Sequence, residues 1–429
     1  MFVTGFALFL GAEGYILGIL TASAPLAQFF QVFAALKTRD LSSRKNYVLS
    51  RALISRLFPI LWMVLPFIFS RNTSLIIFLV IYSISNLYQN LATNAWFGWI
   101  SDLIPKKFRG RFFGIRNRYL SLAGLLIGYI GASFMDLFRK NYSPLLDFLY
   151  KAGFKYPQKL HITLSRNYGE LWGFALIFLM GGIMGIISWY ILRKQPEPRR
   201  HLPKAGMSSF EYFAFPFRDA NFRRLLYFSI WWFFTALVAS PFWMPFMLNT
   251  LKFTFLEIQV YGTIATISSI LSLKFWGKLI DKFGNKPVMA IAIVMGMINP
   301  LYWVIVTPKT FWLIYFEAIS SGIMWSAAGL VSTNIILSIA PVKEKDMYIA
   351  VMSAALGVAG AISAILSGFM LGLLPKAGLF GLKLYPMQYM FLLCSLARLS
   401  AEVPLIFVRE KDAKNFREIM RRIFSKKAS

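Results

Sequence analysis

The chain has 429 residues, of which 57% are hydrophobic and only 15% are charged, and its formal net charge is +28. About a quarter of the residues of a soluble globular protein are charged, so the composition excludes that class. The positive charge lies in short segments between apolar runs, which argues against a nucleic-acid-binding surface and indicates an integral membrane protein. One cysteine and two histidines predict no metal site, and no phosphate-binding or dinucleotide motif predicts a cofactor or an enzyme.

Apolar runs long enough to cross a bilayer follow one another along the chain. The first run, residues 1–10, covers roughly 15 Å of helix and is therefore only about half a span. The full-length runs lie near 15–36, 47–69, 74–100, 112–136, 169–193, 224–249, 256–276, 287–306, 310–339, 347–374 and 385–408. We therefore expect an all-α integral membrane protein of twelve transmembrane helices, with the first truncated and with Pro241 able to kink the seventh.

Lysine and arginine gather in alternate loops between these runs. The basic loops lie near 37–46, 101–111, 194–222, 277–286 and 340–346. Because cytoplasmic loops carry an excess of these residues, we expect the loops and the C-terminus to be cytoplasmic and the protein to lie in the inner (plasma) membrane. The basic, amphipathic tail at 410–429 suits the surface of the inner leaflet.

An internal repeat divides the chain into halves. Residues 99–124 can be aligned with residues 334–360, with Pro105 on Pro341, so six spans are followed by six more. The expected parts are a six-helix bundle at 1–193, a cytoplasmic linker at 194–222, a second six-helix bundle at 223–409 and the tail at 410–429.

The same repeat bears on the short first run. Residues 6–10 match the outer end of the seventh span at 246–251, so roughly fifteen residues of the first helix are missing relative to the repeat. We expect a start site assigned too far downstream. A naturally shortened first helix is the alternative.

Residues 277–287, GKLIDKFGNKP, resemble the loop 8–9 copy of the signature G-x-x-x-D-x-x-G-x-[RK] of the major facilitator superfamily. The fixed positions are occupied by Gly277, Asp281, Gly284 and Lys286. The resemblance implies two six-helix bundles related by an axis along the membrane normal, and secondary active transport by alternating access. The first-half copy departs from the pattern, since Ala35, Arg39 and Ser42 stand where glycine, aspartate and glycine are expected.

The resemblance also implies a cytoplasmic latch, because in this superfamily each signature loop meets the start of a helix of the other half. The expected contacts join Asp281 to Arg111 or Arg116, and Arg39 to Glu344 or Asp346. The charges of the second contact are exchanged relative to the first, so both stay attractive. The alternative is that these basic residues serve only to orient the chain.

Ionisable residues within the predicted spans are candidates for function because burying them is costly. Glu317 is the clearest, and since burial disfavours a charged carboxylate it is a candidate proton carrier. A structural hydrogen bond is the alternative for Glu317. Arg398 and Glu402 are four residues apart, so we expect them to pair on one helix face.

Uncharged polar and aromatic side chains are the candidates for contact with a substrate. The candidates are Asn86, Asn90 and Asn94 on one stripe of the fourth span, Gln28 on the second span, and Trp231 and Trp232 on the seventh. Amides could bind a polar solute, and tryptophan rings could stack on a sugar or hold a lipophilic cation. The alternatives are hydrogen bonds between helices and tryptophans that face lipid.

We therefore expect a monomeric, proton-coupled secondary transporter of a small organic solute, with the lipid bilayer as its surroundings and no cofactor, metal or nucleic acid. The many aromatics and few charges slightly favour efflux of amphiphilic compounds. The amide stripe favours uptake of a sugar or another nutrient. A transport-incompetent sensor or a lipid scramblase is the third alternative, favoured by the short first helix.

Overall fold

The computed structural model describes residues 1–39, 41, 43–139, 150–153, 157–165, 169–197, 209–341, 345–374 and 384–410. Within these residues every regular element is helical. Ten of the described helices are long and apolar enough to cross a membrane. The short first helix and an interrupted seventh span complete the predicted series, so the expectation of an all-α membrane fold is confirmed.

The chain forms two compact units. Unit 1 consists of Met1–Gly206 and Trp243–Val260, and unit 2 consists of Met207–Phe242 and Tyr261–Ser429. The segment Trp243–Val260 thus belongs with the N-terminal helices, although sequence analysis assigns it to the second bundle. The predicted extents of the bundles, linker and tail remain predictions.

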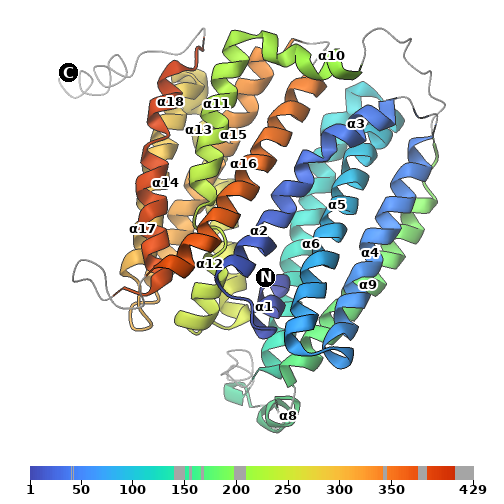
Figure 1. Ribbon diagram of the computed structural model, residues 1–429, viewed down its shortest axis with the longest axis vertical. Helices are drawn as coiled ribbons and strands as arrows, with labels where there is room; N and C mark the ends of the chain where they lie inside the picture. The colour runs from blue at the N-terminus through green and yellow to red at the C-terminus, as the bar shows by residue number, and fades with distance from the viewer. Residues whose placement is uncertain are drawn as a thin grey trace. The chain divides into compact units, whose positions relative to one another are not determined.

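Unit 1 is a bundle of long helices, coloured from blue to green in Figure 1. Its elements are α1 (Phe2–Phe9), α2 (Gly14–Phe29), α3 (Gln31–Arg39), α4 (Arg44–Ile68), α5 (Arg71–Leu103), η1 (Lys106–Phe108), α6 (Arg109–Phe138), α8 (Pro157–Leu164), α9 (Gly169–Arg193), α12 (Trp243–Pro245), η3 (Phe246–Thr250) and the first residues of α13 (Phe255–Phe283). α4 packs against both α5 and α9, α2 against α5, and α6 against α9. Serine side chains cap the N-termini of two of these helices. Ser43 accepts a hydrogen bond from the backbone N–H of Asn46 in α4, and Ser70 accepts one from the backbone N–H of Thr73 in α5.

The short helix α1 is part of the core of unit 1. Phe6 is only 1% exposed. Its ring meets those of Phe78 and Phe178 edge-to-face, each at 5.0 Å between centroids, and lies 5.4 Å from the ring of Phe174. Such aromatic pairs stabilise a core beyond the area they bury, so these eight residues are held by α5 and α9.

Unit 2 is a second bundle. Its elements are α10 (Ser209–Ala214), η2 (Phe215–Arg218), α11 (Ala220–Leu237), the rest of α13, α14 (Asn285–Ile305), α15 (Leu313–Ile339), α16 (Lys345–Leu373), α17 (Pro386–Leu399) and α18 (Glu402–Phe407). α14 packs against α15 and α17, and α11 against α16. α11 ends at Leu237 and turn residues follow up to Phe242, which agrees with the kink predicted at Pro241.

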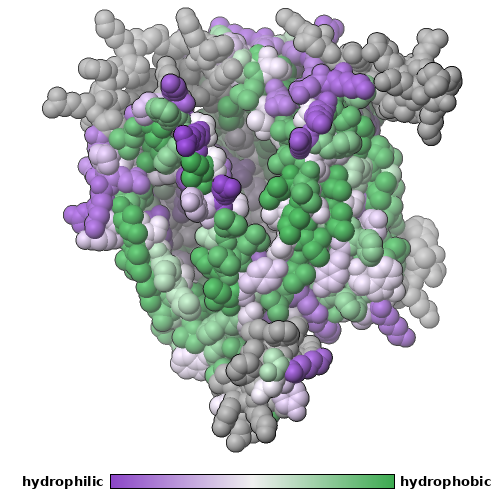
Figure 2. All heavy atoms as spheres, turned by 180° about the vertical axis from the view of Figure 1, so that it is seen from behind, coloured by the Kyte–Doolittle hydropathy of each residue, from purple (hydrophilic) through white to green (hydrophobic). Residues whose placement is uncertain are grey.

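The outer faces of many helices are apolar. Figure 2 shows large hydrophobic areas along the helices, and Leu271 and Ile127 are 75% and 68% exposed. Exposed side chains of this kind are unfavourable in water but suit contact with lipid. The surface therefore agrees with a protein that crosses the membrane several times.

Candidate functional site

A buried carboxyl group lies among the helices of unit 2. Glu317 of α15 is 4% exposed. It accepts a hydrogen bond of 2.8 Å from the hydroxyl of Tyr261, which comes from α13. The ring of Tyr261 in turn meets that of Trp303 edge-to-face at 5.9 Å. The hydrogen bond to a neighbouring helix, which is the alternative stated for Glu317, is thus present, and its role as a proton carrier remains a prediction.

Arg398 is the cation of the same region. It is 3% exposed and donates hydrogen bonds to the carbonyls of Gly296, at 3.0 Å, and Ala236, at 2.8 Å. Its guanidinium lies 5.8 Å from the ring centre of Trp325. Arg398 of α17 thereby connects α14, α11 and α15 within unit 2.

The predicted pairing of Arg398 with Glu402 is wrong. The helix ends at Leu399 and a new one, α18, begins at Glu402, so the four-residue spacing no longer places the two side chains on one face. One carboxylate oxygen of Glu402 is buried without a hydrogen-bond partner in the described part of the chain. The two terminal nitrogens of Arg398 bind backbone carbonyls instead, and its Nε is buried without a hydrogen-bond partner among the described residues.

A pocket of about 380 Å³ lies within unit 2. Two of its walls are the tryptophans Trp232 and Trp325, whose ring centres are 6.2 Å apart. Hydroxyl groups also line it, from Ser229, Ser332, Thr333 and Ser353. The rest of the lining is largely aliphatic, no charged side chain is part of it, and Trp325 connects it to Arg398.

A second polar group, the pair Asn299 and Ser320, joins α14 to α15. The hydroxyl of Ser320 donates to the side-chain oxygen of Asn299 at 2.6 Å, and Asn299 is 1% exposed. The side-chain nitrogen of Asn299 is buried without a hydrogen-bond partner among the described residues. An amide that keeps a free donor is able to bind an oxygen acceptor that enters the bundle.

The amide stripe predicted on the fourth span lies on α5 in unit 1. Asn90 accepts a bond of 2.6 Å from Gln31, and Asn86 donates to Ser23 at 3.2 Å. These bonds join α5 to α3 and α2. Asn94 and Gln28 are half-buried and form no side-chain hydrogen bond with the described residues. A role for the stripe in lining a cavity remains a prediction.

The two predicted tryptophans of the seventh span occupy different surroundings in unit 2. Trp232 is buried and lines the pocket, and its ring packs over Gly296. Trp231 is 44% exposed, and its indole nitrogen donates to the hydroxyl of Ser400 at 2.9 Å. Only Trp232 is therefore placed by its contacts beside a space that a solute could fill.

The signature loop joins α13 to α14 in unit 2. Gly284 has a φ angle of +92°, which only glycine adopts readily. The carboxylate of Glu410 accepts the backbone amides of Asn285, at 2.9 Å, and Lys286, at 2.8 Å. An acidic group at a helix N-terminus satisfies free amides and interacts favourably with the helix dipole.

Lys286 makes the reciprocal connection. Its ammonium group donates to the carbonyls of Ile406 and Val408, at 2.6 and 3.1 Å, at the end of α18. These hydrogen bonds therefore join the start of α14 to the end of α18 and the residues that follow it. Two residues of the signature therefore have a structural role in unit 2: Gly284 through its positive φ angle and Lys286 through these bonds.

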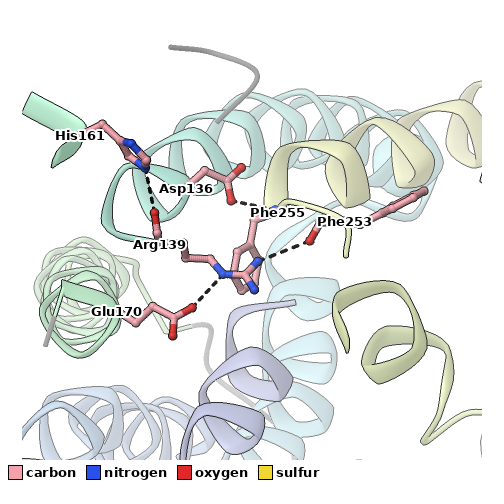
Figure 3. Close-up of polar contacts among 6 residues, drawn as sticks. All are labelled: Asp136, Arg139, His161, Glu170, Phe253 and Phe255. Carbon is pink, nitrogen blue, oxygen red and sulfur yellow. Dashed lines mark hydrogen bonds and ion pairs between the residues drawn. The ribbon is translucent and has the colours of Figure 1, made fainter. Parts of the chain in front are cut away.

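A polar network at the end of α6 was not predicted from the sequence. Asp136 is 1% exposed. One of its carboxylate oxygens accepts the backbone amide of Phe255 (Figure 3) and the other accepts that of Leu256, each at 2.9 Å, so Asp136 caps the N-terminus of α13. Both residues belong to the segment assigned to unit 1.

Arg139 extends this network, as Figure 3 shows. Its guanidinium forms an ion pair of 2.8 Å with Glu170 and donates to the carbonyl of Phe253 at 3.4 Å. The ring of His161 lies 2.8 Å from the carbonyl of Arg139. The network joins α6, α8 and α9 to the segment before α13. Its sequence signal was Asp136 itself, a lone acid at the end of a predicted span.

Comparisons with known proteins agree with this architecture. Residues 226–428 match the family model of the Major Facilitator Superfamily. The structure of the nucleoside transporter NupG is similar over 95% of this chain and 94% of its own, with 12% identity and a TM-score of 0.64. The xylose transporter XylE from E. coli, in an inward open conformation, is similar over 98% and 94%, with 14% identity and a TM-score of 0.65.

A bacterial homologue of the human lysosomal transporter Spinster matches over 95% of this chain and 90% of its own, with 17% identity and a TM-score of 0.59. No curated protein sequence matches the chain. The chain has the major facilitator superfamily fold. The resemblance inferred from the signature loop therefore agrees with the family model over residues 226–428 and with the fold of the whole chain, and the expectation of a multi-pass membrane fold is confirmed.

The residues of the latch expected from the superfamily are each placed within their own unit. In unit 2, Gly277 borders open space, and Asp281 is exposed and forms no bond with described residues. In unit 1, Arg111 is exposed, and the guanidinium of Arg116 lies 4.4 Å from the ring centre of Trp96. The second expected contact joins Arg39 to Glu344 or Asp346. It cannot be placed, because Glu344 and the side chains of Arg39 and Asp346 lie outside the part of the chain that the structure describes. The latch remains a prediction.

Proposed function

We propose that the chain is a proton-coupled secondary transporter that takes up a small, neutral, polar organic solute by alternating access. It would act in the inner membrane with its C-terminus in the cytoplasm. The observation that carries the proposal is the buried bond between Glu317 and the hydroxyl of Tyr261. The superfamily fold supports transport as the activity.

The chemistry of this pair suits a group that gains and loses a proton. A hydroxyl is both a donor and an acceptor. The hydroxyl of Tyr261 therefore donates to the ionised carboxylate of Glu317, and it can accept from the same group once a proton has bound. Arg398, held by two carbonyls, is the cation of the same region. Neither protonation state leaves the carboxyl group without a partner.

The pocket in unit 2 supports a neutral solute. Tryptophan rings stack on the apolar faces of sugar rings, and the hydroxyls of the lining exchange hydrogen bonds with solute hydroxyls. No carboxylate lines the pocket to pair with the charge of a lipophilic cation. Uptake of a sugar or nucleoside is therefore favoured over efflux of amphiphilic cations, in agreement with the names of the similar nucleoside and xylose transporters.

The proposal is tested with the purified chain in proteoliposomes. A panel of labelled sugars, nucleosides and lipophilic cations is screened by counterflow, which requires a bound solute but no gradient. For each solute that exchanges, an inward proton gradient is then imposed. We expect accumulation of a neutral polar solute when the outside is acidic. Accumulation unaffected by the gradient would overturn proton coupling, and exchange of cations alone would overturn the solute class.

Tyr261→Phe sharpens the test because it removes only the hydroxyl. We expect slower gradient-driven accumulation, with counterflow kept close to that of the wild type. The matched control is Tyr227→Phe on α11, whose side chain is 73% exposed and lies outside the pocket lining. Equal accumulation by Tyr261→Phe and Tyr227→Phe would show that the bond to Glu317 is structural.

A further inference from the structure

Unit 1 contains a pocket of its own, separate from the amide stripe. It measures about 290 Å³ and lies among α4, α5 and α9, with one side chain from α6. Its polar lining comprises Arg56, Arg116, Gln89, Gln195, Thr93 and Ser188. Two guanidinium groups, two amides and two hydroxyls thus surround one space inside a helix bundle.

The pocket carries positive charge, and no counterion is found among the described residues that line it. None of its lining residues is acidic. One terminal nitrogen of Arg56 is buried without a hydrogen-bond partner in the described part of the chain. The acids nearest in the chain are engaged elsewhere, since Asp102 pairs with Arg44 at 2.9 Å and Glu197 accepts a bond from Ser43 at 3.0 Å. An unpaired arginine within a membrane helix is costly, so it indicates a binding role.

The two arginines are held in place by their surroundings. The aliphatic stem of Arg56 lies against Gly185 of α9, where a Cβ atom would approach it to 3.1 Å. The guanidinium of Arg116 rests over the ring of Trp96 at 4.4 Å. Fixed guanidinium groups lose less freedom when they bind a ligand, and their fork of donors matches the oxygens of a phosphate.

The pocket extends from the basic end of unit 1 into the bundle. Gln195 lies at that end, where its carbonyl accepts a bond of 2.7 Å from Lys45. Val48 and Arg56 both line the pocket and are eight residues apart on α4, which corresponds to roughly 12 Å along the helix. By the positive-inside rule this end faces the cytoplasm, where anionic lipid headgroups are found.

We propose that this pocket binds a phosphate group, with Arg56 and Arg116 as its principal ligands and Ser188 as a hydroxyl donor. Two sources present that chemistry at the cytoplasmic surface, namely the headgroup of an anionic phospholipid and free phosphate. The site lies wholly within unit 1 and does not depend on Glu317 or on the solute pocket of unit 2.

The test measures thermal stabilisation of the purified full-length chain. One arm adds inorganic phosphate in neutral detergent. The other compares vesicles of phosphatidylcholine with vesicles that also contain phosphatidylglycerol, and native mass spectrometry counts the retained lipids. We expect saturable stabilisation in one arm at least. Stabilisation by phosphate in detergent identifies a free-anion site, and stabilisation by phosphatidylglycerol alone identifies a lipid site.

The variants decide whether the effect belongs to this pocket. We expect Arg56→Gln and Arg116→Gln each to weaken the apparent affinity about tenfold, as expected for the loss of one charge-assisted hydrogen bond. The matched control is Arg51→Gln, because Arg51 is on the same helix but lies over the ring of Tyr47 at 3.6 Å and outside the pocket. If Arg56→Gln does not fold, Arg116→Gln and Ser188→Ala carry the test. Absence of saturable stabilisation in the wild type, or equal affinities for the pocket variants and Arg51→Gln, would overturn the proposal.

Discussion

In unit 1 the buried acid Asp136 uses both carboxylate oxygens to accept backbone amides of α13, whereas in unit 2 the buried acid Glu317 is bound by the hydroxyl of Tyr261. A backbone amide only donates, so a proton on Asp136 would remove one of its bonds. A hydroxyl both donates and accepts. The two buried carboxyl groups are thus suited to different tasks. Asp136 is suited to fixing the start of a helix, and Glu317 is suited to the proton exchange proposed above.

The sharpest way to break this comparison is Glu317→Gln. The amide keeps the size and a hydrogen bond to Tyr261 but cannot exchange a proton. We expect accumulation driven by a pH gradient to fall to background while counterflow persists in proteoliposomes. The control is Glu402→Gln, a partly buried acid on α18 outside the pair. Gradient-driven accumulation by Glu317→Gln at the wild-type level would assign Glu317 a structural role.

Arg398→Met should have the largest effect on stability. The change leaves the carbonyls of Gly296 and Ala236 without their donor inside the bundle. We expect a loss of about 3 kcal/mol in the free energy of unfolding, measured by denaturant titration in mixed micelles. Arg409→Met serves as control, since Arg409 lies beyond α18. A loss no greater than that of the control would mean that water or neighbouring groups replace the guanidinium.

Asp136→Asn tests the other side of the comparison. Only one atom of the amide side chain can accept a hydrogen bond, so one of the two α13 amides loses its partner. We expect a loss of about 1–2 kcal/mol in the free energy of unfolding, with the dependence of accumulation on the pH gradient unchanged. Glu257→Gln, a partly buried acid in the first turn of α13, is the control. If Asp136→Asn abolished coupling, the division of tasks between the two acids would be reversed.

The smallest expected effect concerns the amide stripe. Asn90→Leu removes the bond to Gln31, and bonds of this kind between membrane helices contribute about 0.6 kcal/mol. If Asn90 also lines a cavity, the KM for the solute rises while stability hardly changes. The side chain of Asn94 forms no hydrogen bond with described residues, so Asn94→Leu separates a role in contacting the solute from a role in joining helices. An unchanged KM in both variants would leave the stripe as a helix contact only.

Much of the fold could be predicted from the sequence, because spans require long apolar runs and the signature 277–287 resembles that of the major facilitator superfamily, whose fold the chain has. Glu317 could be found because it is an isolated acid in such a run. The partners of Arg398 could not, since they are backbone carbonyls that carry no sequence signal. The pairing of Arg398 with Glu402 was wrongly predicted because the helix ends at Leu399. The bond between Asp136 and the start of α13 could not be predicted because it joins residues 119 positions apart in the sequence.

The bonds between Glu410 and the start of α14 have a practical consequence for expression of the protein. Glu410 supplies the acceptor for two backbone amides, and Lys286 supplies the donor for the last carbonyls of α18. A purification tag or fluorescent fusion that replaces the chain from residue 410 onward would remove the acceptor of these two amides. The start of α14, next to the signature loop, would then be less stable. Fusions are therefore best placed beyond Glu410, and a truncation series across this position would report the loss as lower yield and faster proteolysis.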